Sequence, residues 1–183
     1  MLYQEEKINY KNHTITFRSA VDEDAPVLVD YLKKVSGETP YLLSEPEEIN
    51  LTLEDEYRFI HKYNSSDSSL LLLAFVDDEY AGNCSFCGYS RIRERHRADI
   101  GIALYQKYTG FGLGRLILER LISIIREAGF KQAELTVVST NGRARNLYEK
   151  LGFVECGRIP NANKYKDGTY SDNILMVLIV IIY

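Results

Sequence analysis

Three closely spaced glycines form the segment of this sequence best suited to bind a phosphate group. Residues 108–115 read Tyr-Thr-Gly-Phe-Gly-Leu-Gly-Arg and precede a segment with the apolar periodicity of a helix. Glycine lets the backbone adopt positive φ angles and approach a ligand closely. The first turn of a helix also carries unpaired N–H groups and the positive end of the helix dipole. The loop is therefore a candidate cradle for a phosphate or pyrophosphate, with Arg115 as an additional charge.

This loop differs from two common nucleotide-binding motifs. A Walker loop ends in Gly-Lys-Ser/Thr, whereas Gly114 is followed here by Arg115. A Rossmann fingerprint requires G-x-G-x-x-G, whereas the spacing here is G-x-G-x-G. The alternative to phosphate binding is a helix-entry turn whose glycines serve packing.

A second pattern follows in residues 141–153, which have the spacing N-x-x-A-x-x-L-Y-x-K-x-G-F. Together with residues 102–104 and 108–114, this pattern resembles the Gcn5-related N-acetyltransferase superfamily (GNAT) over residues 99–153. The resemblance implies an acyltransferase that uses acetyl-CoA and transfers the acetyl group directly to an amine. The family usually has Gln or Arg three residues before the second glycine, where this chain has Thr109. The backbone amides of the loop are unaffected by that difference.

The resemblance also assigns roles to single residues. A backbone N–H at a strand bulge near residues 102–104 is expected to donate to the thioester carbonyl oxygen, where negative charge develops. Tyr148 matches the family tyrosine near the CoA sulfur and is the candidate acid or hydrogen-bond donor for the thiolate. The expected acetyl-CoA-binding residues all lie in the two motifs: Ile102, Ala103, Leu104, Thr109, Gly110, Phe111, Gly112, Leu113, Gly114, Arg115, Asn141, Arg143, Ala144, Tyr148 and Lys150.

Several of these residues have a structural alternative. Tyr148 could be a packed core tyrosine, and Asn141 could cap the helix that follows it, because both roles use the same side-chain oxygen. Arg143, Arg145 and Lys150 could meet the CoA phosphates or could form a solvated helix face. The sequence leaves these alternatives open.

Removal of a proton from the acceptor requires a further group. An alkyl amine has a pKa of about 10.4 in the lysine case and therefore arrives protonated. Asp99 lies three residues before Ile102, at a strand position where relatives often place a carboxylate, and is the candidate base. Its alternative is a salt bridge at a strand end. Glu38, Glu45 and Glu47 are further candidates.

No metal site is expected. Cys84 and Cys87 have C-x-x-C spacing, but positions i and i+3 of a strand point to opposite faces. There is no second C-x-x-C, and the three histidines are scattered along the chain.

The elements that must position these residues alternate between strands and helices. Strands are expected at 13–18, 70–76, 80–89, 97–104, 133–138, 153–158 and 174–182, and helices at 22–34, 51–63, 112–128 and 142–151. This order predicts one α/β (α+β) domain over residues 1–183, with a mixed, mostly antiparallel central sheet flanked by helices. The resemblance implies that the sheet is splayed between strands 97–104 and 133–138, where acetyl-CoA binds.

The net charge and the apolar runs of the sequence exclude several classes of protein. The chain has 22 Lys and Arg against 26 Asp and Glu, a net charge of −4, which argues against nucleic acid as a partner. The N-terminus has no apolar core of a signal peptide, and the apolar run 174–183 is too short to span a bilayer. We therefore expect a cytoplasmic protein with no membrane partner. The run 174–183 is either a strand buried on both faces or an edge that forms a homodimer.

These observations predict an acetyl-CoA-dependent N-acetyltransferase. Residues 166–172 and Met176 resemble members that act on small molecules or protein N-termini, so the expected partner is a substrate with a primary amine. The alternative is a non-catalytic acyl-CoA-binding or sensing domain. A pure binder has no need of Tyr148 or of a base, which makes these residues the discriminating feature.

Overall fold

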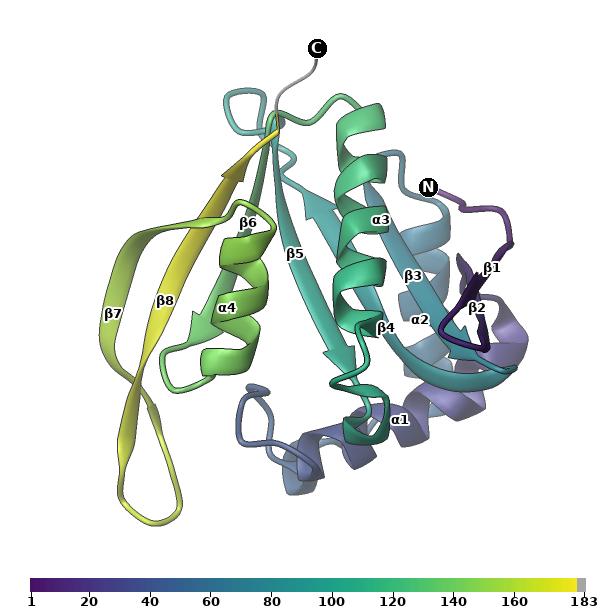
Figure 1. Cartoon of the computed structure of the whole chain (residues 1–183). Coiled ribbons are helices and arrows are strands. Elements are labelled where there is room, and N and C mark those ends of the chain that lie inside the picture. Colours follow the sequence, from purple (N-terminus) through teal and green to yellow (C-terminus); the bar gives the residue numbers. More distant parts are fainter. Residues whose placement is uncertain (181–183) are drawn as a thin grey trace. The chain divides into compact units, whose positions relative to one another are not determined.

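The computed structural model describes residues 1–180, which form two compact units (Figure 1). The first unit contains Met1–Cys87 and Gly101–Leu121, and the second contains Gly88–Ile100 and the chain from Ile122 onward. Strand β5 (Arg97–Leu104) and helix α3 (Leu113–Glu127) each contribute residues to both units. The prediction of a single domain over residues 1–183 stays a prediction.

The first unit is built on antiparallel hairpins. Its strands are β1 (Glu6–Tyr10), β2 (His13–Ser19), β3 (Ser69–Val76) and β4 (Glu79–Gly88), which pair in that order, and the end of β5. Lys11 and Asn12 turn between β1 and β2 with φ angles of 50° and 66°, as a two-residue hairpin turn requires. The β3–β4 turn repeats this geometry at Asp77 and Asp78, with φ angles of 51° and 66°.

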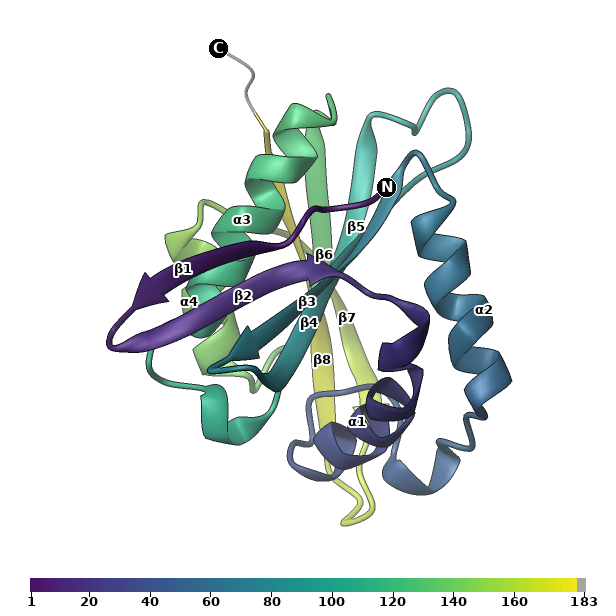
Figure 2. The same ribbon diagram turned by 90° about the vertical axis from the view of Figure 1, so that its right-hand side faces the viewer.

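Helices cover both faces of these strands. Figure 2 shows α1 (Ala25–Gly37) and α2 (Leu53–Asn64) on one face and α3 on the other. Residues 70–74 of β3 are accordingly buried at every position, because both faces of the strand are covered. Thr52 caps α2 in a reciprocal capping box with Asp55. Pro26 lies in the first turn of α1, where its missing N–H costs no hydrogen bond.

The second unit contains the start of β5, then β6 (Gln132–Val138), β8 (Tyr170–Ile179) and β7 (Val154–Lys164) in spatial order. β5 and β6 pair in parallel and the other neighbours are antiparallel. The parallel pairing runs only from Arg97↔Gln132 to Asp99↔Glu134. The splay that the resemblance implies beyond this pairing stays a prediction. Helix α4 (Gly142–Lys150) joins β6 to β7.

The mixed α/β class, with mostly antiparallel strands and flanking helices, is confirmed in each unit. Two features differ from the predictions. Strand β1 is additional, and β7 and β8 continue through much of the expected loop as one long hairpin with an irregular register between Ile159 and Asn163. In addition, β8 lies between β6 and β7, so the alternative of an edge strand is wrong, because β7 already pairs with that side. The alternative of a strand buried on both faces is also wrong, because Leu175 and Ile179 of β8 are exposed. Residues 181–183 of the apolar run lie outside the described residues.

Over residues 1–180, none of the helices has the length and apolar composition that crossing a bilayer requires.

Candidate functional site

The glycine loop connects β5 to α3 in the first unit. A short 3₁₀ turn, η3 (Gln106–Tyr108), precedes it. Gly110 and Gly112 have φ angles of 93° and 108°, which other residues rarely adopt. The Leu116 N–H donates to the Gly112 carbonyl at 3.1 Å, so the N–H groups of residues 112–115 precede the helical hydrogen-bond ladder. The loop therefore has the backbone geometry of an anion cradle.

The β1–β2 hairpin holds this loop in place. The Tyr10 hydroxyl and the Lys11 ammonium both donate to the Phe111 carbonyl, at 3.3 and 2.7 Å. The Phe111 ring lies 5.8 Å from the His13 ring, centroid to centroid. The φ angle of Gly112 requires glycine there, and a Cβ atom would in addition displace the Tyr10 hydroxyl. Sequence reasoning missed these contacts, although a hairpin signal was present in the alternating Ile8 and Tyr10 before the Lys-Asn turn.

The polar side chains of the loop have partners within the protein. The Thr109 hydroxyl donates to the Gln106 carbonyl at 2.8 Å, beside the backbone Thr109 N–H bond to the same carbonyl that closes the 3₁₀ turn. The Arg115 Nε donates to Glu119 at 2.7 Å, one helical turn further on. The first-turn N–H groups of α3 are candidate donors that do not depend on the residue at position 109, and Arg115 stays a candidate because only its Nε is engaged by Glu119.

The end of β5 is held from two sides within the first unit. The Ala103 carbonyl accepts a hydrogen bond from the Tyr31 hydroxyl of α1 at 2.5 Å. On β4, the register with β3 shifts after Ala74, which leaves Ala81 as an extra residue next to Gly82. A Cβ atom at Gly82 would overlap the Ala103 oxygen. The bulge expected in β5 itself, near residues 102–104, stays a prediction.

In the second unit, α4 carries the residues of the second motif. The Asn141 side chain accepts from the Ala144 N–H at 3.1 Å and so caps the helix, which is one of its two predicted roles. Tyr148 is buried, with its ring in an edge contact with Phe153 at 5.9 Å. Burial raises the pKa of Tyr148 to about 12, so the phenol is protonated at neutral pH. Arg143 and Lys150 lie on the exposed side of α4.

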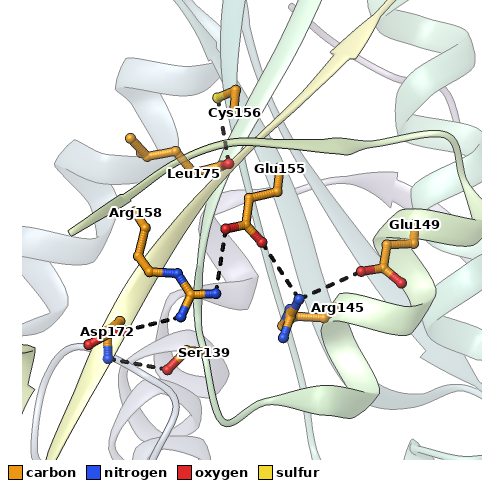
Figure 3. Close-up of polar contacts among 8 residues, drawn as sticks. All are labelled: Ser139, Arg145, Glu149, Glu155, Cys156, Arg158, Asp172 and Leu175. Atoms are coloured by element: carbon orange, nitrogen blue, oxygen red, sulfur yellow. Dashed lines mark hydrogen bonds and ion pairs between the residues drawn. The ribbon is translucent and has the colours of Figure 1, made fainter. Parts of the chain in front are cut away.

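Carboxylates of the second unit engage the remaining arginine of α4 (Figure 3). Arg145 lies 3.8 Å from Glu149 and 3.6 Å from Glu155. Glu155 in turn pairs with Arg158, which reaches Asp172 of β8 at 3.1 Å. This chain of ion pairs favours a structural role for Arg145 over phosphate binding.

Strand β8 also holds the residues just before α4. The Asp172 N–H donates to the Ser139 hydroxyl at 3.2 Å, and the Ser139 N–H donates to the Asp172 carbonyl at 2.8 Å. These two bonds fix the connection between β6 and α4.

Asp99 lies on β5 directly across from Glu134 of β6. Partial desolvation and then the charge of Glu134 raise the pKa of Asp99. Glu134 itself accepts from the Arg97 guanidinium at 2.8 Å and from the Tyr89 hydroxyl at 3.3 Å. Within residues 1–180, the ion pairs of Arg97 are with Glu134 and Glu94 rather than with Asp99. Asp99 is thus an exposed carboxylate with a raised pKa, which suits a base.

The two cysteines of the C-x-x-C motif face different elements, as predicted. The Cys84 thiol points to the Ile117 carbonyl of α3 at 4.0 Å, and the Cys87 thiol contacts the Tyr63 hydroxyl of α2 at 3.2 Å. In the part of the chain that the structure describes, His, Cys, Asp and Glu side chains form no group of three that could hold a metal ion.

Comparison with known proteins identifies the class. Residues 38–153 match the model of the acetyltransferase (GNAT) family, and the chain belongs to this family. A crystal structure of a GNAT-family acetyltransferase from Streptococcus pneumoniae is 34% identical, with a TM-score of 0.86 over 91% of this chain and 99% of that one. The acetyl-CoA complex of a phosphinothricin acetyltransferase from Sinorhizobium meliloti shares the fold, at 17% identity and a TM-score of 0.79 over 91% of this chain and 88% of that one.

Curated relatives match over shorter segments. The mycothiol acetyltransferase of Beutenbergia cavernae is 33% identical over 111 residues, which are 60% of this chain and 36% of the relative. The [ribosomal protein bS18]-alanine N-acetyltransferase of Haemophilus influenzae is 44% identical over 54 residues, which are 30% of this chain and 36% of the relative. The chain thus spans about a third of the length of these relatives.

Proposed function

We propose that this chain is an acetyl-CoA-dependent N-acetyltransferase that transfers an acetyl group directly to a primary amine. The observation that carries the proposal is the glycine loop at the start of α3, inside the segment that matches the GNAT family. Its two positive-φ glycines and its N–H groups ahead of the helix ladder have the geometry that a pyrophosphate requires.

The residues present fit acetyl-CoA as the donor substrate. The loop offers backbone donors and no side chain at Gly110 and Gly112, so phosphate oxygens can approach the main chain. The exposed Arg143 and Lys150 of α4 are proposed to add positive charge for the phosphates. Residues 102–104 at the end of β5 are proposed to hold the pantetheine arm in the manner of an added strand.

Three groups are proposed to serve the transfer. A backbone N–H at the end of β5 donates to the carbonyl oxygen of the thioester, where charge develops; such a donor is worth about 2.7–4 kcal/mol. Asp99 accepts the proton of the amine. The pKa of its carboxyl group is raised toward neutral pH, which makes it a stronger base than an ordinary aspartate. Tyr148, a buried phenol whose pKa is raised further above neutral pH, donates a hydrogen bond to the thiolate.

The acceptor is proposed to be the amine of a small molecule or of a peptide or protein N-terminus. Relatives carry names that cover both kinds, namely mycothiol acetyltransferase, L-amino acid N-acyltransferase and ribosomal protein alanine N-acetyltransferase. A cytoplasmic location and a homodimer stay predictions, as does the absence of nucleic acid as a partner.

The first test is a melting experiment with acetyl-CoA, ATP and NAD at equal concentration. A ligand at 100 times its dissociation constant adds about 2.7 kcal/mol to the free energy of unfolding, which is readily visible. We expect a shift with acetyl-CoA alone, followed by thiol release when amines are added. No shift in folded protein would refute the proposal. Binding without thiol release over amino acids, small amines and N-terminal peptides would favour the acyl-CoA-binding alternative.

A further inference from the structure

A buried tyrosine of α1 reaches the backbone at the end of β5. The Tyr31 hydroxyl donates to the Ala103 carbonyl at 2.5 Å, and Tyr31 is only 2% exposed. Tyr80 and Tyr105 hold its ring by edge-to-face contacts, each with a centroid distance of 5.0 Å. The hydroxyl cannot turn away unless these packed rings rearrange. Burial raises the pKa of Tyr31, so the phenol remains a protonated donor.

This hydrogen bond fixes a whole peptide group. Every described peptide bond is trans, and a trans peptide is planar, so the Leu104 N–H points opposite to the Ala103 carbonyl. A carbonyl that accepts a hydrogen bond also polarises the N–H of its own peptide. On β4, Gly82 leaves room for the Ala103 oxygen, which a Cβ atom there would displace. Tyr31 and Gly82 together define where the Leu104 N–H points.

A second contact ties the same helix to the chain beyond β5. The carboxylate of Glu38, at the C-terminal end of α1, accepts from the Gln106 N–H at 2.7 Å. Between the two contacts, the Tyr105 N–H donates to the Ala81 carbonyl of β4 at 3.0 Å. Helix α1 therefore contacts this segment both before and after Tyr105. Glu38, one of the further candidate bases, thus has a structural contact with Gln106.

On the basis of the proposed function, we propose that Tyr31 is a positioning residue for acetyl transfer. Its hydrogen bond to Ala103 orients and polarises the Leu104 N–H, which donates to the oxygen of the acetyl carbonyl. In the transfer, the amine nitrogen bonds to the acetyl carbon, the C–S bond breaks with its electron pair on sulfur, and the amine proton leaves to the base. Tyr31 forms and breaks no covalent bond in this step.

Tyr31→Phe tests the role, with Tyr80→Phe as the matched control. Both substitutions remove one hydroxyl from the same aromatic cluster, but the Tyr80 hydroxyl accepts from the Asn83 amide at 2.7 Å rather than binding β5. The direct readout is the ¹³C signal of bound acetyl-CoA labelled at the carbonyl carbon. It reports polarisation of the carbonyl without any acceptor, and a purely structural role of Tyr31 would leave it unchanged.

We expect the bound signal to move downfield from free acetyl-CoA in the wild type and in Tyr80→Phe, and to move less in Tyr31→Phe. We also expect kcat of Tyr31→Phe to fall about fivefold to a hundredfold, which is less than the roughly 10²–10³ lost with a whole oxyanion donor. The KM for acetyl-CoA should stay within about twofold, since the contact matters most in the transition state.

The outcomes separate this inference from the function it rests on. Equal carbonyl shifts in the wild type and Tyr31→Phe would refute the role of Tyr31 while leaving the proposed function intact. Failure of the wild type to bind acetyl-CoA would refute both. If Tyr31→Phe does not fold, 3-fluorotyrosine placed at this position alone gives a stronger donor. The signal should then move further downfield, and an unchanged signal would again refute the role.

Discussion

The sharpest test of the proposed chemistry is Tyr148→Phe, which removes a single buried hydroxyl. Burial raises the pKa of Tyr148 to about 12, whereas a thiol has a pKa of about 8.5. Full proton transfer from this phenol to a thiolate is therefore uphill by about 3.5 pKa units, or roughly 5 kcal/mol at about 1.36 kcal/mol per unit. Tyr148 should act as a hydrogen-bond donor to the developing thiolate rather than as an acid that loses its proton.

The size of the effect follows from this role. A hydrogen bond to a charged group contributes about 1.5–3 kcal/mol, so its loss should lower kcat by about 10-fold to 150-fold. Binding of CoA should change little, because the bond forms mainly as charge develops on sulfur. The pH profile of the wild type should show no fall in activity from Tyr148 below about pH 11, since the phenol with a pKa of about 12 is still protonated there.

The assay is steady-state thiol release from acetyl-CoA with a saturating amine, together with thermal unfolding. Tyr63→Phe is the matched control, because Tyr63 is 8% exposed and Tyr148 is 9% exposed. Both variants should keep the free energy of unfolding within about 1 kcal/mol of the wild type. Equal kcat in Tyr148→Phe and Tyr63→Phe would refute the role of Tyr148. A loss of CoA binding as large as the loss of kcat would assign Tyr148 to cofactor binding instead.

Three further predictions follow. Asp99→Asn should lower kcat by about tenfold to a hundredfold near neutral pH and remove the acid limb of the rate profile, because the wild-type carboxylate works only above its raised pKa; an unchanged limb would exclude Asp99 as the base. Gly112→Ala should weaken acetyl-CoA binding and cost about 1–3 kcal/mol of stability, measured by titration and denaturant unfolding, because alanine is strained at a φ of 108° and its Cβ atom would displace the Tyr10 hydroxyl. Gly142→Ala is the control, because Gly142 has open space around it and no positive φ. The Glu134 pKa is lowered by its guanidinium partner, so its stabilisation is present above the unfolded pKa and is lost as pH falls; Glu134→Gln should flatten the loss of Tm below about pH 5.

Local sequence patterns were enough for much of the fold. Periodicity located α2, α3 and α4 within a few residues, and the capping box at Thr52 and Asp55 marked the start of α2. The expected strand Arg97–Leu104 has those bounds in the structure. Helix periodicity, capping and strand pattern depend on residues that are neighbours in the chain, so they can be predicted from the sequence alone.

Long hairpins were harder to predict. Strand β1 is short and mostly polar, and its pairing with β2 is set by a Lys-Asn turn that lacks glycine. The β7–β8 hairpin continues through polar residues because each strand satisfies the backbone groups of the other, regardless of side-chain pattern. Side-chain periodicity cannot show where such pairing ends.

For the candidate site, the sequence by itself determined the residue types: the glycines of the loop, the capping Asn141 and the candidates Asp99 and Tyr148. Only the tertiary structure decided which groups contact these residues and how their pKa values shift. It placed Tyr10 and Lys11 on the Phe111 carbonyl, Tyr31 on Ala103, and Glu134 opposite Asp99. The physical reason is that a glycine loop or a cap is specified by adjacent residues, whereas burial, pKa and the direction of a peptide N–H depend on groups that are distant in the chain.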